Sequence, residues 1–297
     1  MVGLGRLLTA MVTPFDEGGN VDYGQAKKLA IALMNSGSQG LVVAGTTGES
    51  PTLTKEEKLR LFAEVKAAVG DRGAVIAGTG NYNTAESIEL TREAERLGVD
   101  AIMAVVPYYN KPPQQGLFEH FKAIAESTSL PCILYNVPSR TITNLSADTA
   151  IRLSKIDNIV AIKEASGDLN QVAQILQGVE EDFLVFSGND TDTFSILALG
   201  GYGVISVASH LVGKQIWEMM EKYLAGKVTE AAAIHRYLLP LVNALFVVSN
   251  PIPVKHALNH IGFRVGKPRL PLVEPDEKSA AVIEATLKGY SIDLPVS

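Results

Sequence analysis

The sequence predicts an α/β protein, a closed (β/α)8 barrel of the TIM type that carries a C-terminal helical extension. Three observations support this fold. Eight short apolar runs alternate with eight helical stretches along the chain. The runs are continuously apolar, as expected for a parallel sheet covered on both faces. The runs lead into turns rich in glycine, threonine and asparagine, which favour strand-to-helix connections.

The first four units combine an apolar run with a clear turn or helix start. Asp22 is expected to cap the first helix, with Gln25 at its third position, and Thr54 with Glu57 forms a capping-box pattern. Thr84 is expected to cap a helix that continues to about Leu97. The helix after PYYNKPPQQG is expected to end near residue 127. The strands are predicted at residues 7–12, 40–44, 74–77 and 100–106.

The second four units follow the same pattern. Ser146 and Asp168 stand where helix N-caps are expected, the latter for a helix through Leu176. The sixth strand, 159–162, is expected to end at Lys163. The strands are predicted at residues 131–135, 159–162, 183–186 and 203–207.

After about residue 210 the strand pattern stops and only helical patterns remain. They are predicted at residues 217–224, 229–248, 253–261 and 277–289. We interpret them as the last barrel helix and three further helices, which divides the chain into a barrel at 1–225 and a helical region at 226–297. A doubly wound open sheet is the alternative, but no Gly-x-Gly-x-x-Gly follows the first strand.

Composition narrows the class of protein. Hydrophobic residues make up 46% and charged residues 20%, with a net charge of −6 and no basic run. Nucleic acid and anionic membranes are therefore poor partners. The single cysteine, Cys132, lies in the apolar run PCILY and is expected to be a buried core residue in a reducing compartment. The sequence shows no clear cleavage signal and no membrane-length apolar run, so we expect a cytoplasmic protein.

The stretch IVAIKEASGD places Lys163 at the end of an apolar strand. Catalytic groups of such barrels lie at the C-terminal ends of strands. Hydrocarbon surroundings disfavour an ammonium charge, and a free amine is a nucleophile toward carbonyls. The hypothesis is that Lys163 forms a Schiff base with an α-keto acid. The alternative is a lysine that extends from a strand end into solvent.

Other strand ends supply hydroxyl and cationic groups. In GTTGE, glycines flank Thr46 and Thr47, so backbone N–H groups and hydroxyls could surround a carboxylate. Tyr135 could move a proton, and Arg140 matches a carboxylate with two parallel hydrogen bonds. The alternatives are an ordinary turn, a core tyrosine and a surface arginine. Of the adjacent Tyr108 and Tyr109, only one is expected to face the site.

Two further clusters could suggest a metal site. His256 and His260 are four residues apart on a predicted helix, but no third ligand stands near them in the sequence. Asp182, Asp190 and Asp192 form an acidic group that loop solvation and helix capping explain better. We therefore expect no metal.

These segments together resemble the 4-hydroxy-tetrahydrodipicolinate synthases, a family of the pyruvate-dependent class I aldolase and lyase superfamily. The resemblance covers nearly the whole chain and rests on TAMVTPF, GTTGES, PYYNKP, ILYNVPSRT, IKEASGD, SGND and GVISVASH. It implies catalytic roles for Lys163, Tyr135, Thr46 and Tyr109, and substrate-binding roles for Thr47, Arg140, Gly188 and Ile205.

In detail, the resemblance implies that Lys163 binds pyruvate as an imine and that Tyr135 exchanges protons. Thr46 would link Tyr135 to a Tyr109 that reaches in from a neighbouring subunit. The implied second substrate is L-aspartate 4-semialdehyde, and the implied pathway makes diaminopimelate and lysine. No metal or organic cofactor is implied, and the usual assembly of the family is a homotetramer built as a dimer of dimers.

Many relatives are inhibited by lysine, and Ser50, Glu86 and Tyr108 match that site. Inhibited members commonly carry histidines and an asparagine where this chain has Lys55, Lys58 and Tyr82. Two ammonium groups should repel a cationic ligand, so we predict weak or absent inhibition.

Two other functions compete with the synthase. An N-acetylneuraminate lyase or keto-sugar-acid aldolase would share Lys163 and Tyr135, but Arg140 and the Thr46–Thr47 pair favour a small carboxylated aldehyde. A catalytically inactive barrel acting as a small-molecule sensor would form no covalent adduct with pyruvate.

Overall fold

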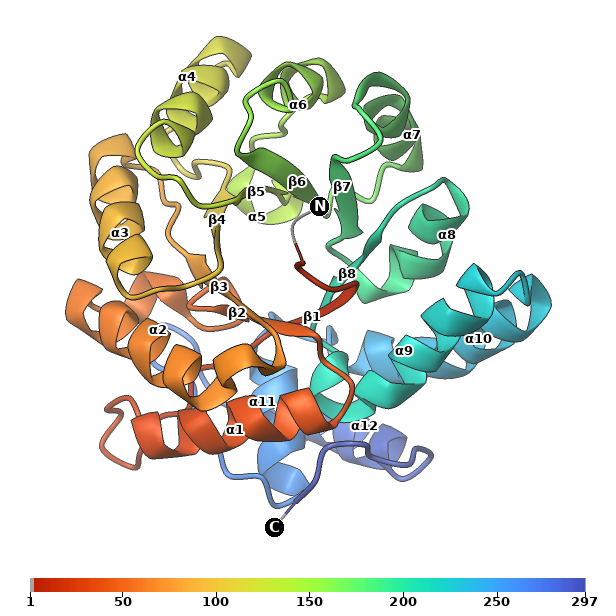
Figure 1. Cartoon of the computed structure of the whole chain (residues 1–297). Helices are drawn as coiled ribbons and strands as arrows, with labels where there is room; N and C mark the ends of the chain where they lie inside the picture. The colour runs from red at the N-terminus through yellow and green to blue at the C-terminus, as the bar shows by residue number, and fades with distance from the viewer. Residues whose placement is uncertain (1–2, 297) are drawn as a thin grey trace.

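The predicted barrel is confirmed: eight parallel strands close into one sheet in sequence order, and helices surround it (Figure 1). The computed structural model describes residues 3–296. The strands are β1 (Leu7–Ala10), β2 (Gly40–Val43), β3 (Ala74–Gly78), β4 (Ala101–Val105), β5 (Cys132–Asn136), β6 (Ile159–Glu164), β7 (Leu184–Ser187) and β8 (Gly203–Ser206). Strand β8 pairs with β1, which closes the barrel.

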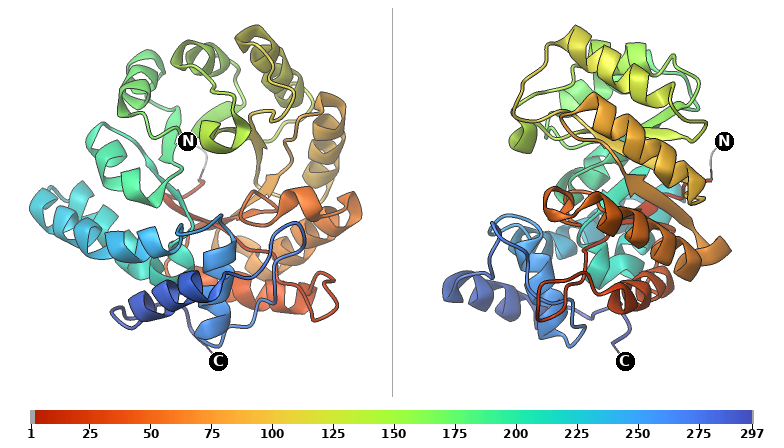
Figure 2. Two further views of the ribbon diagram at one scale, coloured as in Figure 1. Left: turned by 180° about the vertical axis from the view of Figure 1, so that it is seen from behind. Right: turned by 90° about the vertical axis from the view of Figure 1, so that its left-hand side faces the viewer.

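The helices follow the strands and continue beyond them. Those of the barrel are α1 (Tyr23–Asn35), α2 (Lys55–Val69), α3 (Thr84–Arg96), α4 (Gln114–Ala125), α5 (Pro138–Thr141), α6 (Ala147–Leu153), α7 (Leu169–Gly178), α8 (Thr193–Ala198) and α9 (Ser209–Leu224). The later helices are α10 (Val228–Ala244), α11 (Ile252–His260) and α12 (Glu277–Leu287). They lie along one side of the barrel, next to α9 (Figure 2).

Most of the predicted helix starts are confirmed. Asp22, Ser146 and Asp168 each accept backbone N–H bonds at an N-cap, and Thr54 with Glu57 forms a complete capping box. The prediction for Thr84 is wrong, because Asn83 is the N-cap of α3. The Thr84 hydroxyl instead bonds Nδ1 of His120 at 2.9 Å.

The predicted end of the sixth strand is also wrong, because β6 continues through Lys163 to Glu164. Lys163 pairs with Tyr135 of β5 and with Phe186 of β7. Side chains alternate along a strand. Ala161 and Lys163 therefore point into the barrel, whereas Ile162 and Glu164 point outward.

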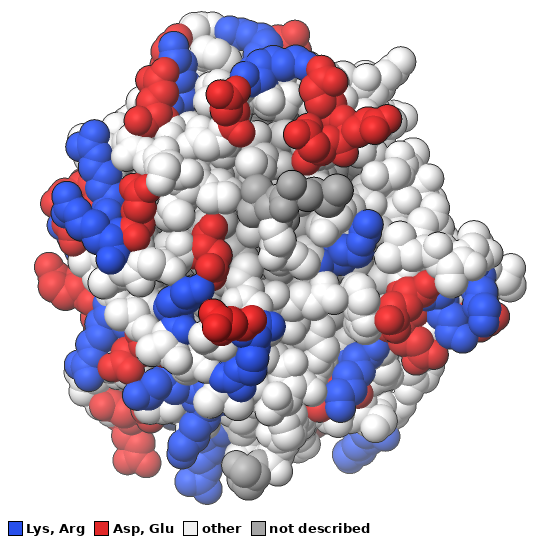
Figure 3. Space-filling view, in the orientation of Figure 1, with Lys and Arg blue, Asp and Glu red and all other residues white. Residues whose placement is uncertain are grey.

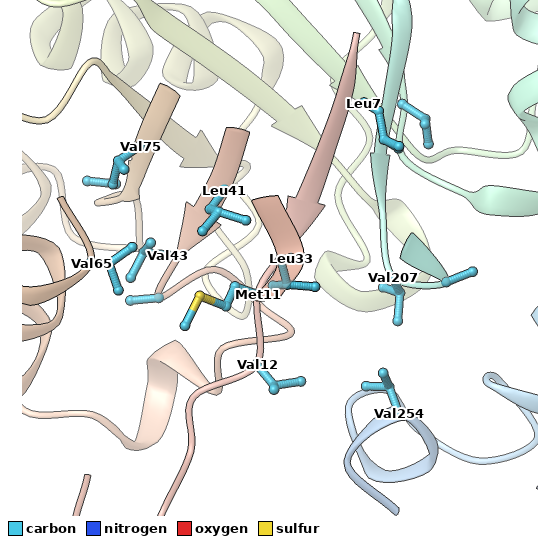
Figure 4. Packing of buried hydrophobic residues seen from close by; sticks show 14 of the residues in the cluster. Leu7, Met11, Val12, Leu33, Leu41, Val43, Val65, Val75, Val207 and Val254 are labelled. Atoms are coloured by element: carbon cyan, nitrogen blue, oxygen red, sulfur yellow. The ribbon is translucent and has the colours of Figure 1, made fainter. Parts of the chain in front are cut away.

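Two apolar layers follow from this alternation. The inner layer fills the barrel, with residues such as Ile133, Phe186 and Ile205. The outer layer lies between strands and helices; Figure 4 shows part of it, including Val254 of α11 near Val12 and Val207. Helix α11 is thereby packed against the C-terminal ends of β1 and β8.

The surface charges and the buried cysteine agree with the expectations drawn from the composition. On the face in Figure 3, acidic and basic side chains are interspersed and neither sign forms a continuous field. Cys132 is buried, as predicted, and burial raises its pKa to about 12. Among residues 3–296, none of the helices combines the length and apolarity that crossing a membrane requires.

Candidate active site

Lys163 is a buried amine inside the barrel. Its residue is 4% exposed, and its Nζ lies 4.4 Å from the centre of the Tyr135 ring. Within residues 3–296 the ammonium takes part in no hydrogen bond or ion pair. A lysine that extended into solvent would not be buried in this way. The Tyr135 ring is also buried, so the amine and the phenol share one apolar surrounding.

A polar network supports the strand behind this lysine. Glu164 points outward and is 1% exposed. Its carboxylate accepts hydrogen bonds from Nδ2 of Asn136, Nε2 of Gln171 and the backbone N–H of Ser166, at 2.8–3.3 Å. Burial raises the pKa of Glu164, and these donors oppose the rise. The network ties the ends of β5 and β6 to α7 and so fixes the backbone beneath Lys163.

A cavity of about 210 Å³ opens next to Tyr135. It brings together three of the predicted residues, Thr46, Tyr135 and Arg140, with Tyr108 at its edge. Gly78 and Gly80 line it because neighbouring strands approach closely there: an added Cβ would lie 2.5 Å from Ala44 O and 2.6 Å from Ala104 Cα, respectively. The remaining predicted residues do not line this cavity: Lys163, Thr47, Tyr109, Gly188 and Ile205.

The segment 45–49 after β2 is a tight turn. Backbone N–H groups of Glu49 and Ser50 donate to the carbonyls of Thr46 and Gly45. Thr47 is 3% exposed, and its Oγ1 accepts a hydrogen bond from Nδ2 of Asn250 at 2.9 Å. This hydrogen bond attaches the turn to a residue of the C-terminal region. An ordinary surface turn would not require such an attachment.

Arg140 is exposed but not free. Its Nη2 donates to the backbone carbonyl of Asn250 at 3.0 Å, while the side chain lines the cavity. It lies on α5, a single turn of helix that the sequence pattern did not reveal. Four residues are too few to show a helical period, although Pro138 at the first position favours a helix start.

The adjacent tyrosines diverge, as predicted. Tyr108 lines the cavity and packs edge-on against Tyr82, with ring centroids 5.0 Å apart. Tyr109 points away, is 91% exposed and has a φ of +73°. A role for Tyr109 in catalysis therefore requires a site other than the one in its own chain.

Gly188 and Ile205 lie at the ends of β7 and β8. An added Cβ at Gly188 would be 2.6 Å from Cβ of Ala165, so the absence of a side chain is required there. Ile205 is 1% exposed in the inner layer of the barrel.

The interpretation of Asp190 as a solvated loop residue is wrong. It is 7% exposed, bonds Ser206 Oγ, and accepts the backbone N–H groups of Val207 and Ala208 at 2.9 and 3.1 Å. Burial raises the pKa of Asp190, and these bonds oppose the rise. Asp192 does not cap α8 with its side chain; it accepts a hydrogen bond from Asn189.

The two neighbouring histidines face a carboxylate that the sequence did not indicate. Glu284 of α12 places Oε1 3.0 Å from Nε2 of His256 and 3.5 Å from Nδ1 of His260. Among residues 3–296, no group of three or more histidine, cysteine, aspartate or glutamate side chains is arranged to hold a metal ion.

Asn250 is not among the predicted residues, yet it contacts both Thr47 and Arg140 across a large separation along the chain. It stands in SNPIP, where asparagine before proline indicates only a turn.

The fold and the buried amine together define a class: a lyase of the class I aldolase type, in which a lysine attacks a carbonyl.

Comparisons with known proteins agree with this class. The model of the dihydrodipicolinate synthetase family matches residues 3–290. A 4-hydroxy-tetrahydrodipicolinate synthase from Dehalococcoides mccartyi is 64% identical over 296 residues, covering 100% of both chains. The chain belongs to the dihydrodipicolinate synthetase family.

Two solved structures show the same similarity in three dimensions. The crystal structure of a dihydrodipicolinate synthase from Bacillus anthracis superposes with a TM-score of 0.96 at 47% identity, covering 98% of this chain and 100% of that one. The structure of the synthase from Cyanidioschyzon merolae, with lysine bound, gives a TM-score of 0.96 at 47% identity, covering 97% and 99%.

Proposed function

We propose that this protein condenses pyruvate with L-aspartate 4-semialdehyde to form 4-hydroxy-tetrahydrodipicolinate, in the biosynthesis of diaminopimelate and lysine. The observation that carries the proposal is the buried Lys163 amine, which lies 4.4 Å from the Tyr135 ring, and that ring lines the cavity. The full-length relative that is 64% identical and bears the name of this synthase supports the choice of substrates.

The first half of the reaction makes a nucleophile from pyruvate. The Lys163 amine attacks the ketone carbon, and loss of water gives an iminium. The positive nitrogen withdraws electrons, so a methyl proton leaves and an enamine forms. Tyr135 gives and takes the protons of the carbinolamine steps. Thr46, which lines the same cavity, would connect Tyr135 to Tyr109 of a neighbouring subunit.

The second half consumes that nucleophile. The enamine carbon attacks the aldehyde carbon of the semialdehyde, whose oxygen is protonated to an alcohol. The amino group of the semialdehyde moiety then attacks the imine carbon, closes the ring and releases Lys163. Because pyruvate binds covalently first, the kinetics are ping-pong. The iminium is the electron sink, so the chemistry requires no metal or organic cofactor, and activity should survive EDTA.

Two cationic or hydroxyl groups would hold the substrate carboxylates. Thr47 would bind the carboxylate of pyruvate, with Gly188 and Ile205 forming the walls. Arg140 would bind the carboxylate of the semialdehyde with its guanidinium, which has donors to spare beyond the one bonded to Asn250. The exposed Arg140 at the cavity suits a group that meets the second substrate on entry.

The proposed assembly is a homotetramer, a dimer of dimers, in the cytoplasm. The 91% exposure of Tyr109 and the 68% exposure of Ile142 support a second copy covering this face.

The barrel at 1–225 would carry the chemistry and the helices at 226–297 would support it. Light scattering after size exclusion should give the mass of four chains, and a Tyr109→Phe variant should lose activity without unfolding.

Borohydride trapping tests the proposal directly. Pyruvate followed by borohydride should add a reduced pyruvyl group to Lys163, located by peptide mass spectrometry. A Lys163→Ala variant should show no adduct. Trapping without condensation of the semialdehyde, or cleavage of sialic acid instead, would assign the site to another Schiff-base lyase. Absence of any adduct in the wild type would remove the proposal altogether.

A further inference from the structure

Asn250 joins two groups of the candidate site that come from different loops. It lies between α10 and α11 and is 6% exposed. Its side-chain Nδ2 donates to Thr47 Oγ1 at 2.9 Å. Its backbone carbonyl accepts from Nη2 of Arg140 at 3.0 Å. One residue therefore contacts the proposed binding group for each substrate, through its side chain for one and its backbone for the other.

The contact with Thr47 determines what the threonine hydroxyl can do. A hydroxyl carries one hydrogen and two acceptor positions. The amide of Asn250 donates, so it occupies an acceptor position and cannot also receive the hydroxyl hydrogen through the same nitrogen. Among residues 3–296, Thr47 Oγ1 makes no other hydrogen bond. Its hydrogen is therefore available for an acceptor in the site, such as a carboxylate.

The side-chain carbonyl oxygen of Asn250 indicates that this residue has a role beyond folding. Oδ1 of Asn250 is buried and has no hydrogen-bond partner within residues 3–296. Leaving a buried acceptor unsatisfied costs free energy, because the acceptor loses its bonds to water and gains none in the protein. An apolar side chain would avoid that cost, so the cost points to a requirement for the amide beside Thr47.

The surrounding structure holds Asn250 firmly. Val254, on α11, packs in the outer layer with Val12 and Val207 (Figure 4). Lys255, also on α11, bonds Glu49 Oε1 at 2.8 Å, and Glu49 lies two residues after Thr47. The region after β8 thus contacts the 45–49 turn at two side chains, the carboxylate of Glu49 and the hydroxyl of Thr47.

We propose that Asn250 is a positioning residue that fixes the hydroxyl of Thr47 as a hydrogen-bond donor toward the carboxylate of pyruvate. This inference rests on the function proposed above. Asn250 does not touch the reacting atoms; it acts through Thr47. Because Arg140 is held by the backbone of Asn250, changing the side chain should affect pyruvate and leave the semialdehyde largely unaffected.

The decisive variant is Asn250→Asp, which keeps the shape and replaces the donor by an acceptor. The Thr47 hydroxyl must then donate to the new carboxylate, and its hydrogen is lost to pyruvate. A hydrogen bond to a charged group is worth roughly 1.5–3 kcal/mol, so KM for pyruvate should rise about 10- to 100-fold. KM for the semialdehyde should change about twofold or less. Ser249→Ala, an exposed neighbour on the same loop, is the matched control and should resemble wild type.

A double-mutant cycle separates positioning from a general structural role. In a Thr47→Val background, Asn250→Asp should add little to KM for pyruvate, since the group through which it acts is gone. The pyruvate concentration for half-maximal borohydride trapping gives a second readout, and thermal melting confirms that each variant is folded.

Wild type that traps pyruvate while folded Asn250→Asp keeps its KM would overturn this inference and leave the proposed function intact. Equal increases in KM for both substrates, or additive effects with Thr47→Val, would also overturn it. Failure of the wild type to trap pyruvate would instead be a failure of the proposed function.

Discussion

Among residues 3–296, two lysines are buried, Lys163 in the barrel and Lys255 on α11, and they differ in what surrounds the amine. Lys255 is 1% exposed and bonds Glu49 at 2.8 Å and the carbonyls of Thr13 and Lys267 at 3.0 and 3.1 Å. Lys163 is 4% exposed and, within residues 3–296, has no acceptor at all. Each lies over an aromatic ring, Phe15 at 4.2 Å and Tyr135 at 4.4 Å.

The difference distinguishes a lysine whose donors are all paired from the one proposed to act as the nucleophile. Three acceptors satisfy all three N–H donors of Lys255, so its nitrogen has no free direction from which to attack. Burial lowers the pKa of Lys255, and the charge of Glu49 opposes the lowering. Within residues 3–296, no acceptor is paired with the Nζ of Lys163, so none of its N–H donors is engaged. Burial alone therefore does not distinguish the two lysines; the absence of acceptors around Lys163 does, and it supports the proposed role as a nucleophile.

The largest expected effect is on catalysis at Lys163. Lys163→Met should lower kcat roughly a thousandfold or more, because the proposed imine forms on the amine that this substitution removes. Its free energy of unfolding should change by about 1 kcal/mol, since no ion pair is broken. Steady-state rates and urea denaturation check both values. A variant that stays active, or that unfolds, would contradict the contrast between the lysines.

The matched substitution at the other lysine should do the reverse. Lys255→Met should reduce the free energy of unfolding by about 3–5 kcal/mol, because the Glu49 carboxylate is left buried without its cation. Replacing Glu49 by Gln in the same chain should recover part of the loss. Folded protein should still trap pyruvate on Lys163. Denaturation curves of the single and double variants decide the point.

A buried histidine, His210, extends the comparison to a side chain whose burial favours the neutral form. Nδ1 of His210 donates to the Val207 carbonyl, and Nε2 accepts from the Val12 N–H at 3.2 Å. Burial lowers the pKa of His210 to about 4 from its usual 6.5. The folded state then binds fewer protons, so its contribution of about 3 kcal/mol is present above pH 6.5 and is lost as pH falls toward 4.

The raised pKa values of buried Asp190 and Glu164 act in the opposite direction over acidic pH. The measurement is therefore the difference in unfolding free energy between wild type and His210→Asn. That difference should shrink as pH is lowered from 7 to 4. A constant difference would show that His210 does not titrate with folding.

The smallest effect concerns Lys55 and Lys58, two partly buried lysines that also differ in the carboxylates beside them. Lys55 bonds Glu89 and Glu93 at 2.6 and 2.5 Å, so its charge is balanced. Burial lowers the pKa of Lys58, and only the charge of Glu86 opposes it. We predict weak or absent inhibition by lysine, with Lys58 the main cause. Lys58→His should increase inhibition by 1 mM lysine more than Lys55→His; strong inhibition of the wild type would refute this.

Much of the fold could be predicted, because a strand buried on both faces needs a continuous apolar run. The prediction errors occurred where contacts between distant parts of the chain determine the local structure. Lys163 and Glu164 are charged and so suggested the end of a strand, yet pairing with β5 and β7 continues through both. Asn83 and Thr84 are both good N-caps, and the sequence did not show that His120 of α4 would engage the threonine hydroxyl.

The candidate site was predictable where a side chain lies at or just beyond the C-terminal end of a strand, as for Thr46, Tyr135 and Lys163. It was not predictable where residues meet across the whole chain. Asn250 and Thr47 are 203 positions apart, and neither local pattern nor composition indicates the bond between them. Asp190 was misjudged for the same reason, because its partners lie on β8 and in the residues that follow it.

The attachment of the 45–49 turn to residues 250–269 has a consequence during synthesis. The ribosome synthesises this turn more than 200 residues before Asn250, Lys255 and the Arg269 backbone, which hold it in the folded protein. A nascent chain with all eight strands outside the exit tunnel would lack these anchors until residues 250–269 have also emerged. The proposed pyruvate pocket should therefore form after the sheet and not together with it.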